Sequence, residues 1–143
     1  MMLHPTIFNF FCFCSCLKNM SSRIFHKDLS YRIVGLAIQA RKELGFGFLE
    51  KVYENALMVL FEENGIRAEQ QVPIKIRFHG RVIGDVIADI LVEEEIIVEL
   101  KAQDKIAAAH KAQTLNYLKA TGLKLAILLN FGKHNLEHDR LVF

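Results

Sequence analysis

Two carboxylates and one ammonium interrupt an otherwise apolar stretch in the second half of the chain. Residues 88–102 read ADILVEEEIIVELKA, and the three charges that stand apart from the central Glu run are Asp89, Glu99 and Lys101. A buried ion without a partner costs several kcal/mol, so charges placed among strand residues need a structural or chemical reason. This stretch constrains both the fold and the site.

The run predicts an antiparallel β-hairpin. Strand-forming residues lie on both sides of residues 93–95, which form a three-residue loop in this interpretation and pair Val92 with Ile96. The same register sets Asp89 opposite Glu99. Directly opposed residues point to one face of a sheet, so we expect their carboxylates to meet.

Side-chain alternation adds Lys101 to the face that carries Asp89 and Glu99. A sheet covered on both sides is expected, because both faces are apolar around the charges. The opposite face is predicted to carry Ala88, Ile90, Val92, Ile96, Val98 and Leu100. The residues predicted to surround the charges are Ile87, Leu91 and Ile97.

Two facing acids need a cation, a shared proton or open water, and a divalent metal satisfies this need best. Hard oxygen ligands on neighbouring strands suit Mg²⁺ or Mn²⁺, so Asp89 and Glu99 are predicted metal ligands. Lys101 would orient a metal-bound water or stabilise a phosphoryl oxyanion. The alternative is a structural salt bridge between Lys101 and one of the acids.

The remaining pattern alternates helices and strands in a defined order. Helical spacing, strand alternation and the Gly and Pro positions predict two helices, a three-stranded meander, a helix and a strand, with a further edge strand at the C-terminus. Pro73 marks either an edge strand or the start of a strand, and Gly84 marks a bend. The predicted ranges are 29–44, 48–64, 70–78, 81–92, 96–101, 106–121, 125–130 and 140–143.

The arrangement of Asp89 followed by Glu99-Leu100-Lys101 resembles the PD-(D/E)xK nuclease superfamily, in which the first acid lies on one strand and Glu-x-Lys on the next. Ala88 stands where the Pro of that motif would be. The resemblance implies an α/β (α+β) fold with a restriction-endonuclease-like αβββαβ core, a mixed central sheet flanked by helices, and a metal site.

Two flanking motifs extend the resemblance. The segment from Gly47 to Tyr53 is similar to the signature of the GxxExxY family, a branch of the superfamily, and it implies that Glu50 approaches the metal centre. Gln113 and Tyr117 are similar to the Gln-x-x-x-Tyr pair of RecB-like nucleases. Together the motifs cover residues 44–130.

Each flanking residue also has a structural interpretation. Glu50 could be a solvated boundary residue, and Glu54 is a weaker candidate on the same helix. Tyr53 is interpreted as a core aromatic that positions Glu50. Gln113 and Tyr117 share a helix face and could lean over the strand of Lys101, or form a polar part of the core.

Length and charge indicate one globular domain, predicted for residues 21–143. The chain has 143 residues, 52% of them hydrophobic, and a formal charge of +2. A generic polyphosphate binder is often strongly basic, so any basic groove must be local. The pattern His134 to His138 imitates a zinc-protease motif but lacks the long helix that such a site needs.

Residues 1–20 differ from the rest and are predicted to be an apolar N-terminal extension that is not native. Its apolar part, residues 1–17, lacks a basic leader and is shorter than the roughly 20 residues of a membrane helix, so no membrane association is expected. All three cysteines, Cys12, Cys14 and Cys16, fall in it. A cysteine-free globular part fits a cytoplasmic protein.

The sequence thus predicts a Mg- or Mn-dependent nuclease that hydrolyses phosphodiester bonds in DNA or RNA. Asp89, Glu99 and Glu50 are the predicted metal ligands, with Lys101, Gln113 and Tyr117 as further catalytic candidates. A non-catalytic nuclease-fold module that binds nucleic acid or a protein partner is the alternative. A homodimer formed through the terminal strand or the first helix is a third hypothesis.

Overall fold

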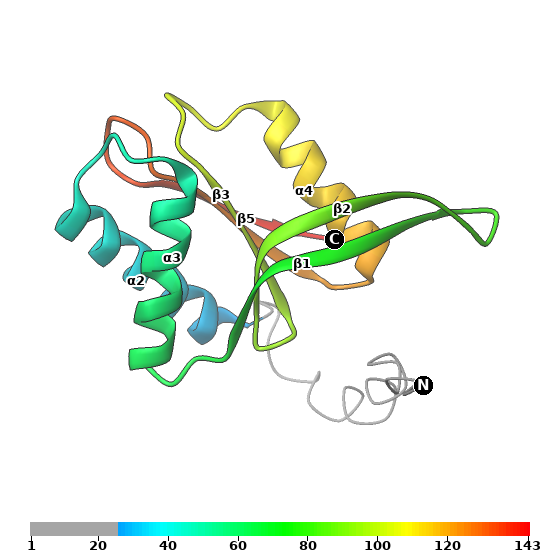
Figure 1. The fold of residues 1–143 in the computed structure, drawn as a ribbon, viewed down its shortest axis with the longest axis horizontal. Helices are drawn as coiled ribbons and strands as arrows, with labels where there is room; N and C mark the ends of the chain where they lie inside the picture. The colour runs from blue at the N-terminus through cyan, green and yellow to red at the C-terminus, as the bar shows by residue number, and fades with distance from the viewer. Residues whose placement is uncertain (1–25) are drawn as a thin grey trace.

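The computed structural model describes residues 26–143 (Figure 1). The predictions for the N-terminal extension and its three cysteines therefore lie outside the described residues. The helices are α2 (Lys27–Leu44), α3 (Glu50–Glu63) and α4 (Ala108–Thr121). The strands are β1 (Ala68–Phe78), β2 (Arg81–Val92), β3 (Ile96–Lys101), β4 (Leu125–Asn130) and β5 (Glu137–Val142).

The strands form one mixed sheet in the order β1-β2-β3-β4-β5. β3 and β4 are parallel and are joined through α4, while the other neighbouring pairs are antiparallel. This confirms the predicted mixed sheet with flanking helices. β2, β3 and β4 have their predicted bounds, and Pro73 lies on an edge strand as expected.

Two apolar layers hold the helices on opposite faces of the sheet (Figure 1). On one face, residues of α2 and α3 such as Ile33 and Leu57 pack with Ile90, Val98 and Ile127. On the other, Leu118 of α4 packs with strand residues that point the opposite way. The continuous burial of β3 and β4 follows from this two-sided cover.

At Asp89 the alternation of β2 side chains between the two faces of the sheet is broken. The prediction that Ala88 and Ile90 share one face is therefore wrong. Ile90 packs in the layer beneath α2 and α3, but Ala88 packs in the layer beneath α4. In β1, Gln71 has φ 53° and drops out of the register that pairs its two neighbours with β2. Strict alternation placed Ala88 and Ile90 on one face, and the distortion at this point reverses that phase.

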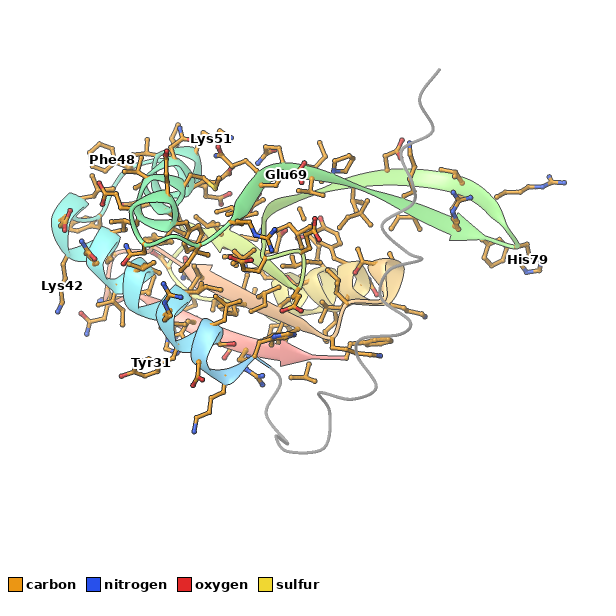
Figure 2. All side chains as sticks on the ribbon, turned by 90° about the horizontal axis from the view of Figure 1, so that it is seen from below. Tyr31, Lys42, Phe48, Lys51, Glu69 and His79 are labelled. Atoms are coloured by element: carbon orange, nitrogen blue, oxygen red, sulfur yellow. The ribbon has the colours of Figure 1, made fainter. Side chains whose placement is uncertain are left out.

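The outer end of the hairpin projects away from the helices (Figures 1 and 2), and Figure 2 labels His79 at its tip. Ile87 is exposed there, so the prediction that it surrounds the charged residues is wrong. Leu91 and Ile97 do pack together in the layer beneath α4. The register shifts where Ile76 pairs with Gly84, which confirms the bend expected at that glycine.

Candidate active site

Asp89 and Glu99 meet where β2 and β3 separate. The predicted register is confirmed for three pairs and its last backbone pair is Ile90 with Val98. Beyond this pair, side-chain acceptors take the place of backbone carbonyls in the hydrogen bonds between the strands. The Asp89 N–H donates to Glu99 Oε1 at 3.0 Å, and the Leu100 N–H donates to Asp89 Oδ2 at 2.8 Å. The predicted proximity of the two acids is therefore confirmed, and both carboxylates satisfy strand amides that would otherwise lack partners.

Burial makes this pair electrostatically costly when both acids are ionised. Glu99 is only 3% exposed, and burial followed by the charge of Asp89 raises its pKa from 4.5 to about 8. Burial also raises the pKa of Asp89, against the lowering effect of the Leu100 N–H. A bound cation would relieve the repulsion that these shifts express.

Lys101 ends β3 beside the two acids. It pairs with Asn130 in the parallel ladder, and its charge lowers the pKa of both Asp89 and Glu99. Among residues 26–143, however, no carboxylate lies within ion-pairing distance of its ammonium. The alternative of a direct salt bridge with an acid is thus not what the structure shows.

The start of α3 brings two more acids toward the pair. Glu50 is half-buried in the first turn, and its charge raises the pKa of both Asp89 and Glu99. Glu54 also raises the pKa of Asp89. Both acids are therefore part of one electrostatic cluster with the strand residues.

Glu54 is more important structurally than its sequence position suggested. It is 3% exposed, and its Oε1 accepts bonds from Lys51 Nζ at 3.0 Å, Gln70 Nε2 at 2.8 Å and Gln71 Nε2 at 3.0 Å. These bonds link α3 to β1 at the point where the hairpin is distorted. The two glutamines were missed because they follow the ordinary polar positions of a half-buried strand and belong to no motif.

Of the two candidates on α4, Tyr117 is buried beside the site and Gln113 is exposed. Tyr117 is buried, and burial followed by the charges of Glu99 and Asp89 raises its pKa. Gln113 is exposed, so the interpretation of this residue as polar core packing is wrong. His110 accepts a bond from the Ala107 N–H at 3.0 Å and caps the helix.

Asn130 was also missed, although it is a polar residue at the end of an apolar strand. It is buried, its Oδ1 accepts from the Gln103 N–H at 2.9 Å, and its Nδ2 donates to the Gln103 carbonyl at 2.9 Å. This two-bond clasp fixes the chain just after Lys101. The position of the lysine therefore depends on β4 as well as on its own strand.

Gly132→Ala is expected to disturb this clasp. A Cβ at position 132 would lie 2.0 Å from the Gln103 carbonyl oxygen, a backbone atom that can move only with its loop. We expect a loss of about 1 to 3 kcal/mol in the free energy of unfolding, measured by urea titration. Gly35→Ala, at a site with open space, is the matched control. Equal stability of the two variants would contradict the close approach.

Tyr53 confirms its predicted role in the core. Its hydroxyl donates to the Gly45 carbonyl at 2.7 Å, and its ring stacks on Phe131 with centroids 4.5 Å apart. Phe48 meets the same ring edge-on at 6.2 Å. These contacts fix the turn between α2 and α3, and hence the place where α3 presents Glu50.

The described residues contain no group of three His, Cys, Asp or Glu side chains close enough to hold a metal ion. Glu50 thus does not complete a ready set of ligands with Asp89 and Glu99. Mg²⁺ commonly binds one or two carboxylates and keeps several waters, so the two strand acids suffice for such a site. The assignment of roles to all these residues stays a prediction.

The family model of the PD-(D/E)XK nuclease superfamily matches residues 27–141. The chain belongs to the PD-(D/E)XK nuclease superfamily. No curated protein matches it in sequence.

The chain is similar to two solved structures. The crystal structure of SSO0001 is 20% identical with a TM-score of 0.52, over 64% of this chain and 48% of that one. The chain therefore spans about half the length of SSO0001. An alkaline exonuclease (LHK-Exo) from Laribacter hongkongensis is 13% identical with a TM-score of 0.48, over 83% of this chain and 71% of that one.

Across residues 26–143, no helix has both the length and the apolar character needed to cross a bilayer.

Proposed function

We propose that the protein is a Mg²⁺- or Mn²⁺-dependent nuclease that cleaves phosphodiester bonds in DNA or RNA, and that it belongs to the GxxExxY branch of the superfamily. The observation that supports catalysis most directly is the meeting of Asp89 and Glu99 at the diverging ends of β2 and β3, beside Lys101. Membership in the nuclease superfamily and the Glu50 and Tyr53 arrangement add to it. A cytoplasmic setting is part of the same proposal.

The donor set fits a hard divalent cation. Asp89 and Glu99 supply carboxylate oxygens from neighbouring strands. Burial raises the pKa of both acids, and the charge of Asp89 raises the pKa of Glu99 further, so a bound cation would stabilise their ionised forms. Glu50 is close enough to act on both charges and would hold a water rather than the ion. A bound Mg²⁺ or Mn²⁺ would activate water and offset charge on the substrate phosphate.

The other residues supply positioning and charge. The Lys101 ammonium has no ion-pair partner among the described residues, so it is free to orient the attacking water or a non-bridging phosphate oxygen. Tyr117 is buried beneath α4, near enough for the charges of Glu99 and Asp89 to raise its pKa, and would close that side of the site. Gln113, exposed one turn earlier, can donate to the substrate strand.

Manganese titration by calorimetry tests the metal site. Wild-type protein is expected to bind Mn²⁺ with a Kd in the millimolar range or tighter, and Glu99→Ala is expected to bind none, because one of two ligands is lost. Glu63→Ala, at the other end of α3, makes the same charge change away from the site. Absence of binding in the wild type would favour the alternative of a non-catalytic nucleic-acid-binding module.

A further inference from the structure

We propose that a cleft beside Glu50 binds an unpaired nucleotide of the substrate strand, with Phe46 and Phe48 as stacking surfaces for its base. The inference rests on the proposed nuclease function, because it names the part of the substrate that lies next to the cleaved bond. Duplex bases already stack on their neighbours and offer no free faces, so the site would select single-stranded nucleic acid.

The cleft is a hollow of about 640 Å³ formed by three separate segments. Residues 46–51 supply one wall, from the turn after α2 into the first turn of α3. Residues 102–104, after β3, and residues 131–133, after β4, supply the others. A nucleotide-sized ligand therefore meets the ends of both parallel strands and the start of a helix at once.

Three large apolar side chains are exposed along this wall. Phe46 is 59% exposed, Phe48 48% and Leu49 80%. Gly47 between the two aromatic residues has φ 105°, a conformation that an L side chain rarely adopts. The backbone thus places consecutive apolar groups outward at a cleft, where exposure of this kind commonly marks a binding surface.

The aromatic wall is held in place by the core. Phe48 packs on Tyr53, which is itself bonded to Gly45 and stacked on Phe131. The Arg41 guanidinium lies 5.6 Å from the centre of the Phe46 ring.

The same Arg41 side chain also joins two walls of the cleft. It donates to the carbonyls of Gly132, Lys133 and His134 at 2.9 to 3.1 Å. A wall ordered before binding loses little conformational entropy when a base stacks on it.

The mixed charges of the cleft favour a ligand that binds by base stacking rather than any polyanion that binds by charge alone. Lys51 and Lys133 line the cleft and can contact phosphate, although Lys51 also pairs with Glu54 at 3.0 Å. Glu50 and Asp104 line it too and offset those charges. Affinity would therefore come largely from base stacking, with two ammonium groups to guide the backbone. Figure 2 labels Phe48 and Lys51 near one another at the same end of α3.

The cleft adjoins the proposed metal site through Glu50 and the residues that follow Lys101. Glu50 lines the cleft, and its charge also acts on Asp89 and Glu99. Residues 102–104 follow directly on Lys101. A nucleotide bound there would lie beside the phosphate that is attacked.

Binding measured without metal tests this proposal apart from cleavage. Fluorescein-labelled oligothymidylate and a blunt DNA duplex are titrated in EDTA with full-length protein, and anisotropy gives each Kd. Phe46→Ala is expected to raise the Kd for oligothymidylate about 5- to 50-fold and the Kd for the duplex less than about 2-fold. Phe46→Trp is expected to restore single-strand binding.

Val59→Ala, an exposed apolar residue of α3 outside the cleft, is the control and should bind like the wild type. Thermal unfolding shows that Phe46→Ala remains folded. The proposal is overturned if Phe46→Ala and Val59→Ala bind oligothymidylate equally, or if Phe46→Ala weakens duplex and single strand alike. Phe46-dependent binding by a protein that cuts nothing would overturn catalysis and retain the binding site.

Discussion

Asp89→Asn is expected to lower the kcat for phosphodiester cleavage by about 10³-fold or more. Asn retains an oxygen that can accept the Leu100 N–H, which Asp89 Oδ2 accepts at 2.8 Å. The variant therefore keeps the hydrogen bond between β2 and β3 but loses the negative charge that would bind a cation. The measurement is cleavage of labelled single-stranded and duplex DNA and RNA with Mg²⁺ or Mn²⁺.

Asp85→Asn is the matched control, because Asp85 lies on the same strand and loses the same charge. Asp85 pairs with Lys75 at the exposed part of the hairpin, so its substitution is expected to leave kcat unchanged. Measuring both variants at saturating substrate separates catalysis from binding. Cleavage by Asp89→Asn at the rate of Asp85→Asn would remove Asp89 from the catalytic machinery.

The sheet was predictable because apolar runs and turn residues give strong signals. The strands from Arg81 to Val92, Ile96 to Lys101 and Leu125 to Asn130 have the predicted bounds. The residues between Val92 and Ile96 form the predicted turn, with positive φ at Glu93 and Glu94. The register that follows from this turn brings Asp89 to Glu99 without any tertiary information.

The interruption of the sheet at Asp89 could not be predicted from alternation. A period of two assumes a regular ladder, whereas Gln71 adopts φ 53° and leaves the β1–β2 pairing. Glu54 accepts bonds from Gln70 and Gln71 across the gap between α3 and β1, and such long-range contacts leave no local pattern. Ala88 packs beneath α4 on the far side of this distortion, opposite to the face that regular alternation predicts.

The candidate site was predictable in its strand residues and less so in its helices. A charge within an apolar strand is rare enough to be informative, so Asp89, Glu99 and Lys101 could be found. On α4 the spacing of Gln113 and Tyr117 is visible in the sequence, but which of them is buried is not, because that helix has no strong apolar stripe. Only the structure shows Tyr117 buried and Gln113 exposed.

The metal-free protein is expected to lose stability as the pH rises from about 5 to 8. Glu99 has a pKa of about 8 in the folded protein against 4.5 ordinarily, so between these values the folded state binds more protons than the unfolded state. The free energy of unfolding therefore falls with rising pH. The contribution of Glu99 is on the order of 4 kcal/mol when complete, and the raised pKa of Asp89 acts in the same direction.

Glu99→Gln isolates this effect, since Gln keeps an oxygen for the Asp89 N–H and cannot ionise. In EDTA the two proteins should have similar stability near pH 4.5, and the Gln variant should melt on the order of 10 °C higher above pH 8. Glu63→Gln, at the far end of α3, should follow the wild type at every pH. Parallel stability curves for the wild type and Glu99→Gln would show that burial and the charge of Asp89 do not raise the pKa of Glu99 in the folded protein.

Added Mn²⁺ should then raise the melting temperature of the wild type at pH 8 and narrow its difference from the Gln variant. A cation that binds only the folded wild type stabilises it by mass action, and it also favours the ionised form of Glu99 that burial opposes. The Gln variant lacks that ligand charge, so its melting temperature should not change. A structural role for Glu99 alone predicts that Mn²⁺ leaves the difference between the two melting temperatures unchanged, because nothing in such a role depends on manganese.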